Sequence, residues 1–291
     1  ASRQLFAKLA LPGTVPYIAC VSFDSFEVSI NSGTLACMRK ASSYCSIRVA
    51  ISGSPTSASD CLFKNNQVVD DMIHVVYADI VFKRCTLLDA KADALDIDMS
   101  NALIEDCLFK GSGNDGVDLM SSNVRIVDSI MRNNGDKGIS VGEGTSLFAA
   151  QNTIDGNLIG VESKDGSVAL LFNHDFVENE KSLNAYKKNW QYGDGGHIFV
   201  SKSQLSNNEV QATADKDSHI DIYDSFVQKK KDEKRVDFYE VDETEKNVAT
   251  NKNWLPEELL SKESVANILQ ETPQSELGRI LQDVRGRHRD D

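Results

Sequence analysis

The chain has 291 residues, 41% of them hydrophobic, and 44 acidic against 31 basic residues give it a formal net charge of −13. This length allows one large domain or two ordinary ones, each with a buried core. The acidic excess argues against nucleic acid binding, which needs a lysine- and arginine-rich face, and favours binding of cations, or of polyanions through cations. No segment is long and apolar enough to span a membrane.

Residues 1–45 are predicted to form an N-terminal cap followed by irregular first coils. Within them, residues 2–11 (SRQLFAKLAL) place apolar side chains at helical spacing. We expect this segment to cover the open end of a repeat structure, which would otherwise expose its core and unpaired strand groups.

Residues 46–228 contain a repeat with a period near 22 residues. Two apolar positions recur in each unit, two residues apart, which is the spacing of a β-strand. Glycine, asparagine and aspartate separate the strands, as expected for turns. A leucine-rich repeat would need a Leu-x-x-Leu-x-Leu frame, which is missing. The sequence therefore predicts a parallel β-helix with about three short strands per rung. The first apolar column consists of Ile73, Leu95, Val117, Ile139, Val161 and Leu183.

Two further columns suggest how the rungs stack. Asparagines recur at one turn and are expected to hydrogen-bond from rung to rung; they are Asn66, Asn134, Asn157, Asn179 and Asn208. Cys61, Cys85 and Cys107 share another column, which continues as Ser129. We interpret these three cysteines as small buried thiols without disulfides, and the pairing of Cys20, Cys37 and Cys45 stays open.

The rungs that contain NDGVDL, NNGDKGISVGEGT and IGVESKDGS resemble the right-handed parallel β-helix repeat family of the pectate-lyase-like superfamily, including bacterial surface and secreted repeat domains. The resemblance covers roughly residues 46–228. It implies the fold and a secreted or cell-surface location, and it says less about activity.

The residues between the two apolar columns must point away from the core. Stacked carboxylates about 4.8 Å apart repel each other by roughly 1 to 3 kcal/mol, and a bound cation would relieve this repulsion. We predict Ca²⁺ as a possible cofactor, with Asp96, Asp98, Asp118 and Glu162 as its ligands. The alternative is that solvent, salt and rotamer freedom suffice.

One repeat step is 29 residues long, and its excess falls in residues 183–197. Insertions in repeat proteins mark one face, often the binding face. Aromatic side chains can stack on sugar rings and lysines can meet carboxylates, so we predict an acidic polysaccharide or other glycan as a partner. The alternative is that Trp190 packs on the coil. The predicted binding residues are Tyr186, Lys187, Lys188, Trp190 and Tyr192.

The strings GNDG (113–116) and GDKG (135–138) are similar to the catalytic rungs of polygalacturonases, but Lys137 replaces a required aspartate, so we reject glycoside hydrolysis. A polyuronate lyase or C5-epimerase fits a lysine better, because it removes a proton next to a carboxylate. Lys137 or Lys164 would be the base, with His74 or Tyr186 as proton donor and Asp118 beside them. The rival hypothesis is a non-catalytic surface or structural module that binds Ca²⁺ or a protein.

Residues 229–291 are predicted to form a charged, partly helical C-terminal extension. One helix is expected over residues 255–269, starting near Pro256, and another over residues 272–284, with Thr272 as N-cap and Pro273 as first residue. This extension could fold back on the coil or bind a protein partner.

Overall fold

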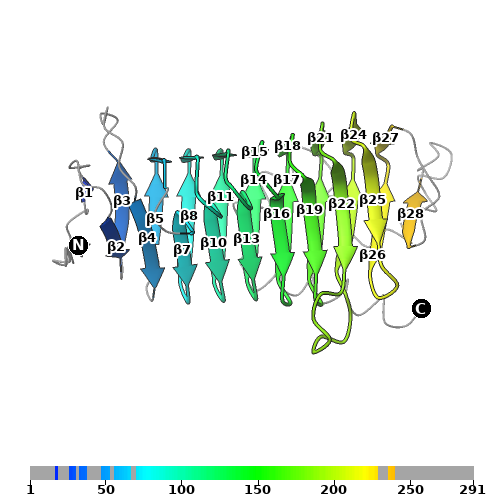
Figure 1. Ribbon diagram of the computed structural model, residues 1–291, viewed down its shortest axis with the longest axis horizontal. Helices are drawn as coiled ribbons and strands as arrows, with labels where there is room; N and C mark the ends of the chain where they lie inside the picture. Colours follow the sequence, from blue (N-terminus) through cyan, green and yellow to red (C-terminus); the bar gives the residue numbers. More distant parts are fainter. Residues whose placement is uncertain are drawn as a thin grey trace, which may run out of the picture.

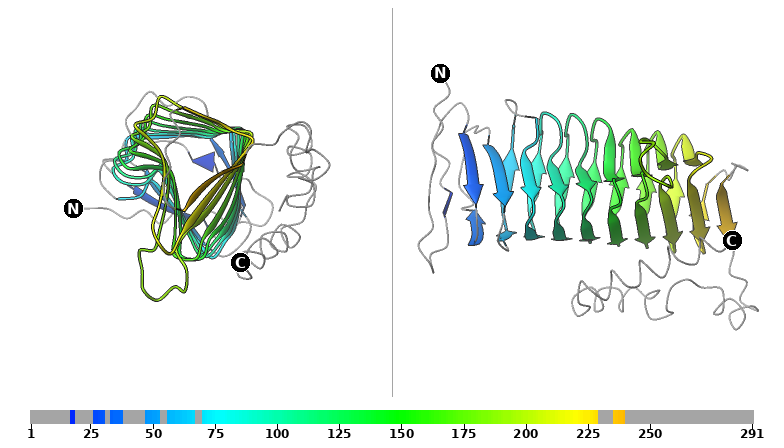
Figure 2. Two further views of the ribbon diagram at one scale, coloured as in Figure 1. Left: turned by 90° about the vertical axis from the view of Figure 1, so that its right-hand side faces the viewer. Right: turned by 90° about the horizontal axis from the view of Figure 1, so that it is seen from below.

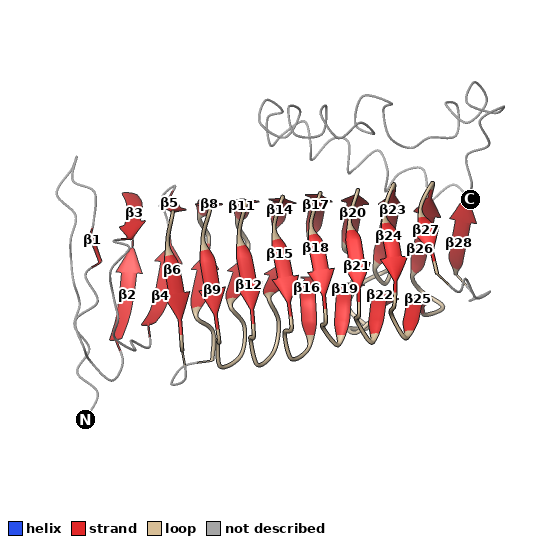
Figure 3. Ribbon diagram, turned by 90° about the horizontal axis from the view of Figure 1, so that it is seen from above, coloured by secondary structure: helices blue, strands red, loops and turns tan. Residues whose placement is uncertain are grey.

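A computed structural model of the protein describes residues 17–18, 26–30, 33–37, 47–52, 56–66, 70–228 and 235–239. These residues form strands and the loops between them, without a helix (Figure 3). The strands stack as successive coils along one axis (Figure 1). Seen along that axis, three parallel sheets form the sides of a roughly triangular coil (Figure 2).

Each sheet takes one strand from each successive rung. The eleven-stranded sheet consists of β1 (Tyr17–Ile18), β3 (Gly33–Cys37), β5 (Thr56–Ser59), β8 (Asp79–Lys83), β11 (Asn101–Glu105), β14 (Asn123–Val127), β17 (Ser146–Ala150), β20 (Val168–Phe172), β23 (His197–Ser201), β26 (His219–Tyr223) and β28 (Val236–Tyr239). The nine-stranded sheet consists of β2 (Phe26–Ile30), β4 (Ile47–Ser52), β7 (Ile73–Val76), β10 (Leu95–Asp98), β13 (Val117–Met120), β16 (Lys137–Gly142), β19 (Ile159–Lys164), β22 (Lys181–Tyr186) and β25 (Val210–Ala214). The eight-stranded sheet consists of β6 (Leu62–Lys64), β9 (Thr86–Leu88), β12 (Leu108–Lys110), β15 (Ile130–Arg132), β18 (Thr153–Asp155), β21 (Asp175–Val177), β24 (Gln204–Ser206) and β27 (Phe226–Val227).

The strand register confirms the predicted repeat. Leu95 pairs with Ile73 on one side and Val117 on the other, and all three are buried in the core. The register of the next position places His74, Asp96 and Asp118 side by side on the outward face. Because side chains alternate between the two faces of a strand, the column of apolar residues fixes the column of polar ones.

Many corners of the coil combine a left-handed residue with a buried polar residue that follows it. Asp128 has a φ of 51°, and the Oγ atom of Ser129 then accepts a hydrogen bond from the backbone N–H of Cys107, one rung earlier, at 3.0 Å. Buried backbone N–H groups need such partners. Three ladders of this kind run along the coil: Cys107, Ser129, Asn152, His174, Ser203 and Ser225; Asn134, Asn157, Asn179 and Asn208; and Ser100, Ser122, Thr145 and Ser167.

The ladders confirm the predicted asparagine stack and explain the cysteine column. Cys61, Cys85 and Cys107 are buried thiols outside disulfide bonds, as expected. His174 replaces a small residue in the same ladder: its Nδ1 accepts the Asn152 N–H at 3.2 Å, and burial lowers its pKa to about 4. The imidazole is therefore neutral at physiological pH, and its role is structural.

The glycines at the start of GNDG and GDKG are required by close backbone contact. A Cβ atom on Gly113 would lie 2.2 Å from the carbonyl oxygen of Lys91, and one on Gly135 would lie 2.4 Å from the carbonyl oxygen of Gly113. The two strings are similar because they occupy the same corner in consecutive rungs.

Both predicted terminal regions contribute strands to the coil. Strands β1, β2 and β3 lie within residues 1–45, and β28 lies within the predicted extension and pairs with β26. The described part of the extension is therefore strand rather than helix. Residues 2–11, the two expected helices and the side chains of Cys20, Cys37 and Cys45 lie outside the described residues.

Candidate functional site

The first polar group on the outward face of the nine-stranded sheet joins β7 and β10. His74 Nε2 lies 2.9 Å from Asp98 Oδ2 and 3.3 Å from Asp96 Oδ2, and each of the three side chains is about a fifth exposed. Their donor atoms all lie within 4.8 Å of one another, close enough to share one cation. Asp118 follows directly, because it pairs in register with Asp96.

The carboxyl group of Asp96 is held in an unfavourable environment for a charge. Burial first, and then the neighbouring carboxylates of Asp98 and Asp118, together raise its pKa to about 8. A proton or a cation would relieve both effects. Of the four predicted metal ligands, the structure thus brings Asp96 and Asp98 together and places Asp118 next to them.

Glu162, the fourth predicted ligand, lies elsewhere. It occupies the same column as Asp96 but three strands further on, at roughly 14 Å by strand spacing. It cannot share a cation with Asp96. Conversely, His74, which the sequence predicted as a proton donor, completes the donor group with Asp96 and Asp98.

A second carboxylate column at the start of the strands has a structural role that the sequence did not reveal. Oδ1 of Asp93 accepts hydrogen bonds from the Asp115 N–H and the Asn114 side-chain amide, both at 2.8 Å. Oδ1 of Asp115 accepts the Lys137 N–H at 2.9 Å. Burial raises the pKa of Asp93 to about 6, and burial, opposed by Lys137, raises that of Asp115 to about 7.

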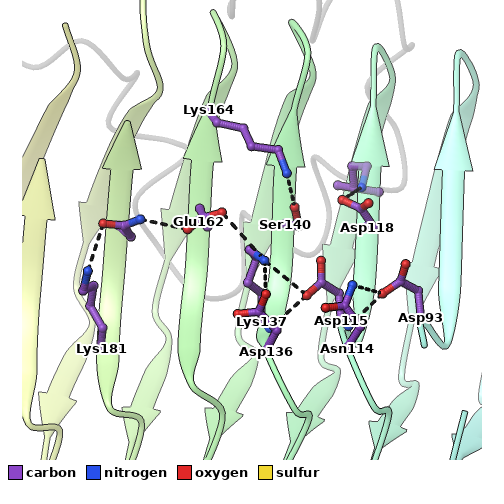
Figure 4. A network of polar contacts seen from close by, with 12 residues as sticks. Asp93, Asn114, Asp115, Asp118, Asp136, Lys137, Ser140, Glu162, Lys164 and Lys181 are labelled. Carbon is purple, nitrogen blue, oxygen red and sulfur yellow. Dashed lines mark hydrogen bonds and ion pairs between the residues drawn. The ribbon is translucent and has the colours of Figure 1, made fainter. Parts of the chain in front are cut away.

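Lys137 balances the charge of this column (Figure 4). Its ammonium group is hydrogen-bonded to Asp136 and lies 3.5 Å from Asp115 Oδ1 and 3.9 Å from Glu162 Oε1. Burial lowers the pKa of Lys137, but the three carboxylates outweigh this effect and raise it above its ordinary value. Lys137 therefore keeps its proton and is a poor general base.

Lys164 is in a different environment. It is only 6% exposed, and its Nζ donates a hydrogen bond to the neutral Ser140 Oγ at 2.9 Å (Figure 4). Tyr186 is its partner in register on β22. Burial, followed by the charge of Glu162, raises the pKa of Tyr186 to about 12, so its phenol stays protonated.

Glu162 connects Lys137 to the end of this face. Glu162 is only 3% exposed, and its Oε2 accepts a hydrogen bond from the side-chain amide of Asn184 at 2.8 Å. The Asn184 carbonyl oxygen in turn accepts from Lys181 Nζ at 3.2 Å and from Thr213 at 2.7 Å. The polar network is thus continuous from β13 to β25.

The predicted binding loop follows Tyr186 and projects from the coil, where it is drawn in yellow-green in Figure 2. Buried Asp165 holds its base, because Asp165 Oδ1 accepts the N–H groups of Lys188 at 2.8 Å and Asn189 at 2.7 Å. Trp190 is 85% exposed, so it does not pack on the coil. Lys188 is also exposed, whereas Tyr192 and Lys187 are half-buried, and Lys187 Nζ donates to the Gly193 carbonyl at 2.9 Å.

Another His–Asp–Asp group lies on the eleven-stranded sheet and was not predicted. His219 Nε2 lies 3.2 Å from Asp221 Oδ1 and 2.9 Å from Asp237 Oδ2, and hydrogen bonding to Asp221 raises the pKa of His219. The spacing His-x-Asp on one strand was visible in the sequence, but Asp237 belongs to a part of the chain that was not assigned to the repeat.

The three-walled stack of parallel strands defines the protein as a parallel β-solenoid. Residues 71–227 match the family model described as the right handed beta helix region, which covers more than half of the chain. The protein therefore belongs to the right-handed β-helix family, as its sequence predicted. No curated protein and no solved structure matches the chain. Among the described residues, no helix has the length and apolarity to cross a bilayer.

Proposed function

We propose that the outward face of the nine-stranded sheet, from His74 to Trp190, binds an acidic glycan with the help of a divalent cation. The observation that carries this proposal is Trp190, which is 85% exposed on the loop that leaves this face. An exposed indole offers a flat apolar surface for a sugar ring, and exposed Lys188 beside it offers a charge for a uronate.

The cation would be held at the other end of the face. Two carboxylates suit Ca²⁺, which prefers several oxygen ligands. The imidazole of His74 suits Mn²⁺ or Zn²⁺ at least as well. A cation there would neutralise Asp96 and Asp98 and would give a uronate carboxylate a partner on an otherwise acidic surface.

The fixed charge of Lys137 favours glycan binding over catalysis. A lyase or epimerase is the second candidate, and one observation favours it. Lys164 pairs in register with Tyr186, and its ammonium contacts a neutral hydroxyl rather than a carboxylate. Lys164 would be the base and Tyr186 the proton donor. Either function suits a secreted or cell-surface protein, where polysaccharides are encountered.

Calorimetric titration tests the binding proposal. Acidic oligouronates and a neutral oligosaccharide of equal length are compared, each with Ca²⁺, with Mn²⁺ and with chelator. We expect binding of the acidic chains only, with affinity about tenfold weaker for Trp190→Ala, the loss expected for one aromatic stacking contact. Gln191→Ala, an exposed neighbour on the same loop, is the matched control and should bind like the wild type.

Equal affinity of the wild type and Trp190→Ala, or equal binding of the neutral chain, would refute the proposal. Ultraviolet absorbance of the same mixtures detects unsaturated products. Their appearance in the wild type and absence in Lys164→Ala would establish the lyase, whereas product formation by Lys164→Ala would exclude Lys164 as the base.

A further inference from the structure

The outward face of the eleven-stranded sheet carries apolar side chains that are buried without belonging to the core. On β17, for example, Leu147 and Ala149 point into the core, whereas Phe148 and Ala150 alternate with them and point outward. We call the buried outward set the outer apolar patch; its members are Val127, Phe148, Ala150, Val168, Leu170, Phe172 and Phe199.

The outer apolar patch is confined to four neighbouring strands, β14, β17, β20 and β23. At the same register, Val81 and Leu103 on earlier strands are only half-buried, and Asp237 on β28 is exposed. Within the patch, the rings of Phe148 and Phe172 stack with centroids 5.3 Å apart. On the other side, Asp221 on β26 is buried at this register but is a carboxylate, so the apolar character of the face ends on both sides of a defined area.

Something must cover this area, because outward side chains on a solvated sheet would not be 2% exposed or less, as Phe148, Leu170, Phe172 and Phe199 are. Every described strand belongs to one of the three walls of the coil, so no described strand lies over the patch. The burial exists within a single copy of the chain, which points to a segment of the same chain.

We propose that residues 255–284 of the same chain dock on the outer apolar patch. The last described residue, Tyr239, lies in β28, which is an end strand of this same sheet, and the chain continues from there to Asp291. The segment has apolar residues at the i, i+3, i+4, i+7 spacing of an amphipathic helix, at Leu277, Ile280, Leu281 and Val284.

Size and charge agree with this occupant. Four strands span about 14 Å from first to last, and a helix of about 13 residues is about 20 Å long, so one helix can cross the whole patch. Arg125, a basic side chain at the edge of the patch, is 6% exposed. In residues 255–284 acidic side chains outnumber basic ones, so a carboxylate is available to Arg125. This inference does not depend on the glycan-binding proposal.

Hydroxyl-radical footprinting of the full chain tests the inference, because it labels exposed phenylalanine side chains. In the wild type, Phe148, Phe172 and Phe199 should be protected. In the full chain with Leu277→Asp and Ile280→Asp, their labelling should rise several-fold, while the core residues Phe109 and Phe176 stay protected. Gln282→Asp adds a charge in the same segment but outside its apolar positions. It is the matched control and should label like the wild type.

Protection of Phe109 and Phe176 shows that the variant is folded, so unchanged protection of the patch in a folded double variant would overturn the proposal. Protection of the patch that falls on dilution of the wild type would also overturn it, because a second copy would then be the cover. Light scattering on the same samples reports the state of association. Selective labelling of the patch in the monomeric double variant supports the proposal.

Discussion

The Nε2 atom of His74 lies 2.9 Å from Oδ2 of Asp98, on the strand one rung further along the coil. With Asp96 Oδ2 at 3.3 Å, the three side chains form a compact mixed donor set on a solvent-facing sheet. The arrangement gives the predicted cation site a definite composition, and that composition can be tested apart from any glycan.

We expect Mn²⁺ or Zn²⁺ to bind this set, and His74→Ala to weaken binding of these cations at least about tenfold while changing Ca²⁺ binding less, because Ca²⁺ relies on oxygen ligands. Affinity should increase between pH 6 and pH 8, since the Asp96 carboxyl loses its competing proton as the pH approaches its pKa of about 8. Calorimetry on the wild type, His74→Ala and His219→Ala measures these affinities. If His219→Ala removes the binding and His74→Ala does not, the cation is held on the other sheet.

Asp96→Asn should stabilise the protein at high pH. The pKa of Asp96 is raised to about 8 in the folded state from its ordinary value of 3.8. The folded state therefore holds this proton more tightly, and stability falls as the pH rises through the window between these values. We expect the free energy of unfolding of Asp96→Asn to exceed that of the wild type by about 1 kcal/mol at pH 8.5, after screening of this partly exposed group, and to equal it at pH 4.

Asp175→Asn, at an exposed position, is the control. Denaturant unfolding at both pH values, in cation-free buffer with chelator, measures these free energies. A wild type as stable at pH 8.5 as the variant would contradict the burial argument.

Lys137→Met should destabilise the protein by about 2 to 4 kcal/mol at pH 8, because it leaves Asp115 and Glu162 buried without their cation. The loss should be smaller at pH 5, because burial raises the pKa of Asp115 to about 7 and its carboxyl group then takes up a proton. Lys181→Met removes a lysine whose hydrogen bond to the Asn184 amide involves no opposite charge, and it should cost less. Urea unfolding at both pH values checks the order. Equal losses for the two lysine variants would show that the Lys137 contacts contribute nothing beyond packing.

Asn157→Ala should cost about 2 to 4 kcal/mol, since it removes the side-chain acceptor of the buried Asn134 N–H and a side-chain donor to the Met131 carbonyl. Asn207→Gly, at the exposed neighbouring corner position whose φ of 57° glycine adopts without strain, removes no ladder contact of this kind and serves as control. Thermal unfolding of both variants tests whether stability depends on the ladder or only on the presence of asparagines in the turns. Identical melting temperatures for the two would assign the ladder no special stability.

The fold could be predicted from the sequence because two patterns agree. The repeat period and the alternation of apolar and polar residues both indicate stacked parallel strands. Residues 22 apart, such as Leu95 and Val117, are strand neighbours, so every column in the sequence is a column in space. The same arithmetic could have separated Glu162 from Asp96, which lie three rungs apart and cannot share a cation.

The candidate site was harder to predict than the fold, because the identity of a residue does not show which group its side chain contacts. Asp93 and Asp115 are acidic residues like the predicted ligands, yet both accept backbone N–H groups of the next rung. Ser100, Ser122, Thr145 and Ser167 form a complete third ladder, but hydroxyl residues in turns are too common to stand out. Asp165 anchors the Trp190 loop through contacts that depend on the path of the insertion.

The corner ladders also give the coil a direction. The side chain of each ladder residue satisfies the N–H of the rung before it, as Ser129 does for Cys107 and Ser203 does for His174. The hydrogen bonds of a rung are therefore incomplete until the next rung is in place, so rungs can be completed in the order in which they are synthesised. Within the described coil, strands pair only with those of neighbouring rungs, so the coil can fold during its own synthesis, with a single unfinished edge that moves forward as each rung is added.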